Sequence, residues 1–216
     1  MSNDGDLNTG ELFVIAAASG TGKTSLIAAL LERCPQLALS VSDTTRPARR
    51  GEVDGQHYHF LDVDSFRQGI SEQRYLEHAE VFGNYYGTSR ERVKALWEAG
   101  RHALLEIDVQ GAAQVRAAHA DACMIFILPP SMATLSERLN GRGLDEPEVI
   151  QRRLDEARHE IGACGDFDWL VVNDDFDRAV DELAAIVTAW PLRQKRQSAR
   201  VRQLLDESTN PITIKD

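Results

Sequence analysis

Residues 17–24 read AASGTGKT, at the end of an apolar run, ELFVIAAA, that covers residues 11–18. From Lys23 onward, leucine and isoleucine recur at the spacing of one helix face. The order of apolar strand, glycine-containing loop and helix is typical of a phosphate-binding loop, here with alanine in the first glycine position. In such a loop the backbone N–H groups surround phosphate oxygens, and the helix start adds partial positive charge. The sequence therefore predicts a site for the phosphates of ATP.

Two side chains of this loop add to the prediction. Lys23 can reach the β- and γ-phosphates, and the hydroxyl of Thr24 can ligate Mg2+. An ordinary turn between a strand and a helix is the alternative, but the full pattern rarely arises by chance. The residues that we expect to bind ATP here are Ala17, Ala18, Ser19, Gly20, Thr21, Gly22, Lys23, Thr24 and Ser25.

The bulk properties fit one α/β domain with insertions. The chain has 216 residues, 43% of them hydrophobic, and a net charge of -10, which disfavours a general nucleic-acid binder. No apolar stretch approaches the roughly 20 residues of a membrane span. Residues 1–9 are polar and are expected to be a disordered lead-in rather than a secretory signal. The three cysteines form no CxxC pair, so free thiols in the cytoplasm are expected instead of structural zinc.

Strand-like and helix-like segments alternate along the chain, which predicts a parallel five-stranded sheet with helices on both faces. Strands are expected at residues 11–18, 37–42, 102–108, 122–128 and 168–173. Helices are expected from Lys23, at 111–119, 131–140 and 146–161, and from Asp175 with an interruption at Pro191. In such sheets ligands bind beyond the carboxyl ends of the strands, where the candidate chemistry lies.

Residues 42–88 differ from the rest in composition and are predicted to form an inserted lobe. Thr88 is expected to cap the next helix, with Glu91 completing a capping box and Gly100 stopping the helix. A helical lid is predicted at 131–162. The whole domain is expected to span residues 10–216. Its core would consist of residues 10–41, 89–130 and 163–216.

The inserted segment carries groups that suit a nucleoside monophosphate. Arg46, Arg49 and Arg50 lie within five residues, and arginine forks match a dianionic phosphate monoester, although a solvated basic loop is the alternative. Tyrosine hydroxyls can bind phosphate as well, whereas Tyr85 is a better candidate for core packing. A carboxylate such as Glu77 can accept hydrogen bonds from the N1–H and amine of guanine, and adenine would leave it unpaired.

Seven motifs follow one another with the order and spacing of one family. They are SGTGKTS (19–25), SDTTRPARRGEVDGQHYHF (42–60), LEHAEVFGNYYGTS (76–89), LEIDVQGA (105–112), IFILPPS (125–131), RLNGRG (138–143) and VVNDDFD (171–177). On these residues the chain resembles the bacterial guanylate kinases, from about residue 10 to the final helix. The resemblance implies a P-loop NTPase fold and an ATP:GMP phosphotransferase of purine nucleotide metabolism. Such an enzyme converts GMP to GDP with Mg-ATP by direct in-line transfer, and is expected to accept dGMP.

The resemblance also implies roles for individual residues. The GMP phosphate would be held by Arg46, Arg49, Tyr58 and Tyr86, with Glu52 supporting the arginines. The guanine would be read by Ser42, Glu77, Thr88 and Asp108. The catalytic cations would be Lys23 and Arg46 together with the lid residues Arg138, Arg142 and Arg153, and Asn173 would lie near the adenine.

Three positions depart from the family pattern, and one of them is Asp43, which lies beside the phosphate-binding arginines in sequence and would temper their charge. Ala18 replaces the proline that usually precedes the serine of the loop. Glu106 replaces the usual aspartate two residues before Asp108, and its longer carboxylate would assist Mg2+ through water.

Two other functions stay open at this point. A P-loop kinase for dTMP, CMP or AMP should lack the set formed by Ser42, Glu77 and Thr88. A guanylate-kinase-like domain that only binds proteins should lack Lys23 or the lid arginines. The expected partners are therefore ATP and GMP, without nucleic acid or membrane, and the basic tail at 193–202 would allow a homodimer.

Overall fold

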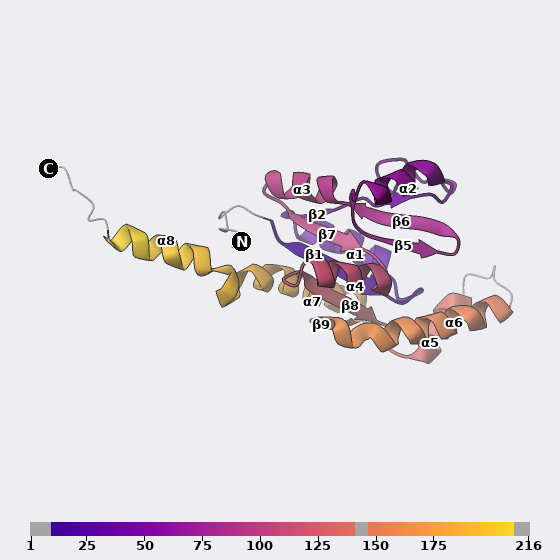
Figure 1. The fold of residues 1–216 in the computed structure, drawn as a ribbon. Coiled ribbons are helices and arrows are strands. Elements are labelled where there is room, and N and C mark those ends of the chain that lie inside the picture. Colours follow the sequence, from indigo (N-terminus) through magenta and orange to yellow (C-terminus); the bar gives the residue numbers. More distant parts are fainter. Residues whose placement is uncertain (1–9, 141–146, 210–216) are drawn as a thin grey trace.

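The structure is a computed structural model that describes residues 10–140 and 147–209 (Figure 1). A parallel five-stranded sheet lies at its centre, with the strand order β2-β7-β1-β8-β9. These strands are β1 (Leu12–Ala17), β2 (Leu37–Leu39), β7 (His102–Glu106), β8 (Cys123–Leu128) and β9 (Trp169–Val172). The predicted sheet is confirmed, although β2 ends three residues earlier than expected.

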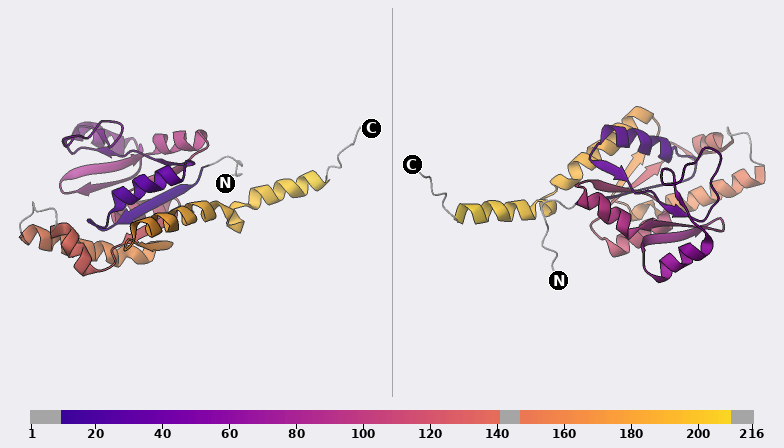
Figure 2. Two further views of the ribbon diagram at one scale, coloured as in Figure 1. Left: turned by 180° about the vertical axis from the view of Figure 1, so that it is seen from behind. Right: turned by 90° about the horizontal axis from the view of Figure 1, so that it is seen from above.

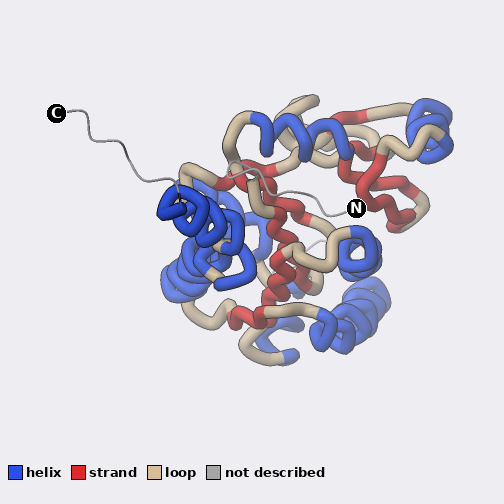
Figure 3. Tube along the Cα trace, turned by 60° about the vertical axis from the view of Figure 1, so that its left-hand side comes forward, coloured by secondary structure: helices blue, strands red, loops and turns tan. Residues whose placement is uncertain are grey.

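Helices pack on both faces of this sheet, as the tube in Figure 3 shows. The helices α1 (Lys23–Arg33) and α7 (Phe176–Ala189) share one apolar core with the sheet. The helices α3 (Arg90–Glu98) and α4 (Val109–Ala118) share the other. All six residues of β1 are buried, because this central strand has a helix layer on each side, and its sequence is therefore apolar without alternation.

Residues between β2 and α3 form a second sheet with the strand order β4-β3-β6-β5. Its strands are β3 (Asp43–Thr44), β4 (His59–Phe60), β5 (Tyr75–Val81) and β6 (Asn84–Ser89), and the helix α2 (Val63–Ser71) belongs to the same segment. Phe66 of α2 stacks on the rings of Tyr75 and Tyr85, with ring centroids 4.4 Å and 5.4 Å apart. Tyr85 thus packs in a small core, as expected.

The predicted cap of α3 was wrong by one residue. Thr88 is still part of β6, and Ser89 is the N-cap, accepting a hydrogen bond from the backbone N–H of Arg92. Glu91 therefore does not complete a capping box with Thr88. The helix ends as predicted before Gly100, whose φ of +69° is the left-handed conformation that glycine favours.

Two further helices, α5 (Met132–Asn140) and α6 (Pro147–Gly162), lie on the opposite side of the molecule from α2 and the β5–β6 hairpin (Figures 1 and 2). Leu135 and Leu139 of α5 and Ala157 of α6 form a small apolar cluster with Ala18. The phosphate-binding loop is thereby packed against the segment that we predict to be the lid.

The C-terminal part is interrupted at Pro191, as predicted. After α7, short 3-10 turns cover Trp190–Leu192 and Gln194–Arg196, and α8 (Ser198–Thr209) then points away from the body (Figure 2). A further 3-10 turn, Ala163–Asp166, joins α6 to β9. Among the residues placed in the structure, no helix is long and apolar enough to cross a membrane. The three cysteines carry free thiols, and the predicted lead-in at 1–9 lies outside the described residues.

Candidate active site

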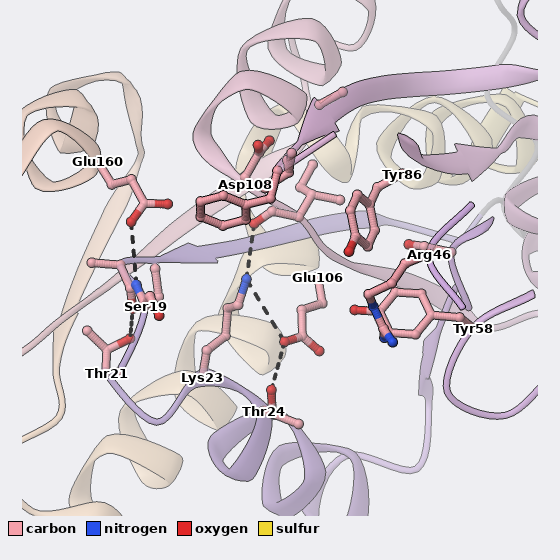
Figure 4. Close-up of a pocket in the computed structure, with 18 of the residues that line it drawn as sticks. Ser19, Thr21, Lys23, Thr24, Arg46, Tyr58, Tyr86, Glu106, Asp108 and Glu160 are labelled. Carbon is pink, nitrogen blue, oxygen red and sulfur yellow. Dashed lines mark hydrogen bonds and ion pairs between the residues drawn. The ribbon is translucent and has the colours of Figure 1, made fainter. Parts of the chain in front are cut away.

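A cavity of about 490 Å3 lies between the carboxyl end of the core sheet and the second sheet (Figure 4). The loop residues 17–25 line one end. The other end is lined by predicted GMP-binding residues, namely Ser42, Arg46, Arg49, Tyr58, Glu77 and Tyr86. Glu106 and Asp108 lie between the two ends. The structure therefore brings together both groups of residues that the sequence predicts to bind nucleotides.

The backbone of the phosphate-binding loop needs its two glycines. Gly20 and Gly22 have φ values of +89° and +90°, in the left-handed region that other residues rarely adopt. A Cβ at Gly22 would also lie 2.8 Å from the side-chain amide nitrogen of Asn173. The buried hydroxyl of Thr21 donates to the carbonyl of Ala18 at 2.6 Å, which closes the loop into a tight turn.

Glu106 connects the two functional side chains of the loop. Its Oε1 accepts a hydrogen bond from the Thr24 hydroxyl at 3.0 Å and lies 3.9 Å from Lys23 Nζ. Lys23 Nζ also donates to the carbonyl of Ile107 at 3.2 Å. The carboxylate that departs from the family pattern thus lies directly beside the predicted metal ligand.

Asn173 and Arg138 support the loop from outside the cavity. The buried side-chain amide of Asn173 donates to the carbonyl of Thr21 at 2.6 Å. Arg138 donates to the carbonyl of Thr21 at 3.4 Å and to that of Asn173 at 3.2 Å. Neither residue lines the cavity, and both predicted roles, near adenine and near the transferring phosphate, stay predictions.

The arginine cluster at the other end is organised by Glu52. Arg46 donates to both carboxylate oxygens of Glu52, at 2.9 Å and 2.8 Å, and the backbone N–H of Arg49 donates to one of them at 2.6 Å. The hydrogen bonds from Arg46 and then from Arg49 lower the pKa of Glu52 to about 2. Arg46 also lies over the ring of Tyr58, 5.4 Å from its centroid, and the rings of Tyr58 and Tyr86 meet edge to face.

Glu77 is a buried carboxylate beside this cluster, with 4% of its surface exposed. Its Oε1 accepts a hydrogen bond from the hydroxyl of Thr88 at 2.6 Å, across the β5–β6 pair. The pKa of Glu77 is raised to about 7 in all: burial is the main cause, the charge of Asp108 adds to it, and the hydrogen bond from Thr88 opposes it. Asp108 itself caps α4 by accepting from the backbone N–H of Gly111 at 2.8 Å. Thr88 does not line the cavity but holds a residue that does.

Helix α6 places two side chains on the loop. Arg153 donates to the hydroxyl of Ser19 at 2.9 Å, and Glu160 accepts from the backbone N–H of Ser19 at 3.4 Å. The two residues lie seven positions apart, and therefore on one face of the helix. Burial raises the pKa of Glu160. Arg142 lies outside the described residues.

Sequence reasoning missed Glu160, which lines the cavity (Figure 4). The available signal in the sequence was that Glu160 lies seven positions after Arg153, and therefore on the same face of a predicted helix.

Comparison with known proteins identifies the family. A family model described as guanylate kinase matches residues 9–190. A guanylate kinase of Neisseria meningitidis serogroup A is 55% identical over 92% of this chain and 97% of its own length. The chain belongs to the guanylate kinase family. A guanylate kinase of Psychrobacter arcticus is 53% identical over 96% of this chain and 100% of its own length.

Solved structures agree with this family membership. The guanylate kinase of Anaplasma phagocytophilum is 32% identical, with a TM-score of 0.76, over 97% of this chain and 98% of its own. The predicted P-loop NTPase fold is therefore confirmed. Guanylate kinases phosphorylate GMP to GDP with ATP, and the prediction of an ATP:GMP phosphotransferase is confirmed by the same comparisons.

Proposed function

We propose that this protein transfers the γ-phosphoryl group of Mg-ATP to a phosphate oxygen of GMP, or of dGMP, by direct in-line attack. The observation that carries the proposal is one cavity with an anion site at each end: the loop with Lys23, and the cluster around Arg46. Phosphoryl transfer requires alignment and charge stabilisation more than covalent chemistry. No side-chain nucleophile enters the proposed reaction.

On the ATP side, the backbone of residues 17–25 would surround the phosphates and Lys23 would contact the β- and γ-phosphates. Arg138 and Arg153 already contact this loop through Thr21 and Ser19, which supports a role for both beside the transferring group. We assign the same role to Arg142 from the sequence alone. Asn173 would lie on the adenine side of the loop.

The oxygen donors beside the loop fit Mg2+. This ion prefers hydroxyl, carboxylate and water oxygens and commonly keeps several waters. The Thr24 hydroxyl would ligate it, and Glu106 would hold one of its waters, because the two oxygens lie 3.0 Å apart. When bound, Mg2+ supplies positive charge that neutralises the transferring phosphate.

On the acceptor side, the GMP phosphate would be bound by Arg46, Arg49, Tyr58 and Tyr86, with Glu52 fixing the orientation of Arg46. Guanine would be read by Ser42, Glu77, Thr88 and Asp108. The carboxylate of Glu77 would accept from the N1–H and the amine of the base, and Thr88 would act through its hydrogen bond to Glu77.

We propose that an acceptor lobe (42–88) and a lid (131–162) close over a fixed core (10–41, 89–130 and 163–216). Closure would exclude water and suppress hydrolysis of ATP. The radius of gyration measured by small-angle X-ray scattering should fall when GMP and a non-hydrolysable ATP analogue are both added. An unchanged radius at saturation would contradict closure.

The central experiment is a coupled ADP-release assay with Mg-ATP and each of GMP, AMP, CMP, UMP and dTMP. Turnover is expected with GMP, and both Lys23→Ala and chelation of Mg2+ should abolish it. Lys94→Ala is the matched control, since Lys94 is an exposed lysine of α3 that pairs with Glu98. Turnover with AMP instead of GMP would refute the proposed recognition of guanine. GMP binding without turnover would favour a protein-binding domain.

We also propose that two copies associate through α8. Val201 and Leu204 are 50% and 59% exposed and lie on one face of this helix. The helix is basic near its start, at Arg200, and acidic near its end, at Asp206, so an antiparallel second copy would bring opposite charges together. Sedimentation should give a dimer that Val201→Ser with Leu204→Ser dissociates, and a monomeric parent protein would refute the proposal.

The setting proposed for the enzyme is the cytoplasm, with ATP and GMP as its partners and without nucleic acid. The net charge of -10 supports the absence of nucleic acid among the partners, because a polyanion would be repelled everywhere except at the local cationic site.

A further inference from the structure

Gly111 is the third residue of α4, where the helix packs against β5 of the second sheet. It is buried, and its backbone N–H donates to Asp108 Oδ1 at 2.8 Å. Its helical backbone conformation is one that any residue adopts, so the turn itself does not require glycine. The reason for glycine at this position lies in the neighbouring side chain.

The carboxylate of Glu77 occupies the space that a side chain at position 111 would need. A Cβ on Gly111 would lie 2.5 Å from Glu77 Oε2 and 3.1 Å from its Cδ, both closer than ordinary van der Waals contact. The other oxygen of Glu77 is held by the Thr88 hydroxyl at 2.6 Å. The carboxylate thus lies between its hydrogen-bond partner on β6 and the bare backbone of α4.

We infer that Gly111 is a positioning residue for guanine recognition: because it has no Cβ, the Glu77 carboxylate can lie close to the backbone of α4, in the position from which it would bind the base. The inference rests on the proposed reading of guanine by Glu77. A methyl group at this position would push the carboxylate away from α4, toward the cavity that the base enters. Two hydrogen bonds to a rigid base tolerate only a small displacement, because such bonds weaken steeply with distance and angle.

The same substitution should leave the fold intact. The two atoms that a new Cβ would clash with belong to the end of the Glu77 side chain, which can move aside, and not to backbone; Asp108 Oδ1, at 3.4 Å, would lie at ordinary contact distance. Alanine also has a higher helix propensity than glycine. Gly111→Ala is therefore expected to keep or raise the melting temperature while it weakens GMP binding. If Gly111 had only a structural role, the substitution would lower the melting temperature and weaken GMP binding together.

The test is a double-variant cycle of Gly111→Ala, Glu77→Gln and the pair, measured as KM for GMP, KM for ATP and kcat/KM for GMP relative to IMP. IMP lacks the exocyclic amine that Glu77 would bind. Gly111→Ala should raise KM for GMP about 10- to 100-fold, the size expected for lost hydrogen bonds to a charged group, and leave KM for ATP unchanged. It should also lower the preference for GMP over IMP. Gly165→Ala, at a glycine with open space around it, is the matched control.

The outcomes separate this inference from the function on which it rests. In the Glu77→Gln background Gly111→Ala should add less than about 3-fold, because the two residues act through one interaction. If Glu77→Gln raises KM for GMP and Gly111→Ala does not, the positioning role is overturned and the reading of guanine stands. If the two effects multiply fully, Gly111 acts through another route and the inference is wrong. If Glu77→Gln does not change KM for GMP, both the recognition of guanine by Glu77 and the positioning role of Gly111 are refuted.

Discussion

Replacement of Glu77 by glutamine should make the protein more stable and less active, with a stability gain that grows with pH. Glu77 is 4% exposed, its hydrogen-bond partner is the hydroxyl of Thr88, and burial raises its pKa from 4.5 to about 7. The side-chain carbonyl of glutamine accepts the same bond from Thr88. Glutamine does not ionise, so the variant removes the buried charge and keeps the shape.

The sign of the effect follows from proton binding. Between pH 4.5 and pH 7 the folded protein keeps a proton on Glu77 that the unfolded chain releases, so this group lowers stability as pH rises through that window. Since each pKa unit corresponds to about 1.4 kcal/mol, the rise of the Glu77 pKa from 4.5 to about 7 costs the parent protein about 3 kcal/mol at pH 8. Glu77→Gln should remove most of that cost at pH 8 and almost none at pH 4.5.

The assay is urea unfolding of the nucleotide-free parent protein and variant at pH 4.5, 6 and 8. The difference in unfolding free energy should increase with pH, toward about 3 kcal/mol. Glu80→Gln is the control, since it makes the same substitution at an exposed position on the same strand. A Glu77→Gln difference that is flat with pH, or that favours the parent protein at pH 8, would refute the argument from burial.

Three further predictions concern the residues around the cavity. Glu52→Gln removes the charge that holds the Arg46 guanidinium and should raise KM for GMP about 10-fold without changing KM for ATP in steady-state kinetics. Asn173→Ala loses a buried hydrogen bond to Thr21 and should lower the unfolding free energy by about 1–2 kcal/mol and raise KM for ATP. A KM for ATP equal to that of the parent protein would exclude a role for Asn173 in holding the phosphate-binding loop. Glu106→Gln should raise the Mg2+ concentration needed for half-maximal rate and leave KM for GMP unchanged, and an unaltered Mg2+ titration would exclude its role at the metal.

The sheet and the loop could be predicted because their signals are local. Strands buried on both faces need continuous apolar runs, as in residues 123–128, and the loop needs glycines where φ is positive. The cap of α3 was missed because Thr88 and Ser89 both carry hydroxyls and stand next to each other. Their hydrogen-bond partners in the fold distinguish the two residues. The Thr88 hydroxyl donates to Glu77, and the Ser89 hydroxyl caps the helix.

The supports of the loop are long-range and could not be predicted in the same way. Glu160 and Arg153 reach Ser19 across 141 and 134 residues, and Asn173 reaches Thr21 across 152. The carboxylate of Glu160 accepts from a backbone N–H, and apart from the helical spacing of Glu160 from Arg153 nothing in the sequence points to this contact. Such contacts depend on how α6 packs over the loop, through the apolar cluster with Ala18, and not on any local pattern.

Glu52 and Glu77 are both carboxylates of the acceptor region, yet their surroundings give them opposite properties. Glu52 binds Arg46 and the Arg49 backbone, its pKa falls to about 2, and it remains ionised beside Arg46, which we propose to bind the GMP phosphate. Glu77 is bonded to a neutral hydroxyl, the charge of the Asp108 carboxylate raises its pKa, and its ionised form is disfavoured. Guanine would supply two N–H donors to that carboxylate, whereas adenine presents an unprotonated nitrogen to it. A base that leaves a buried charge unpaired is penalised far more than one that merely fits loosely. The proposed selectivity for guanine would therefore follow from the same burial that makes Glu77 destabilising in the nucleotide-free protein.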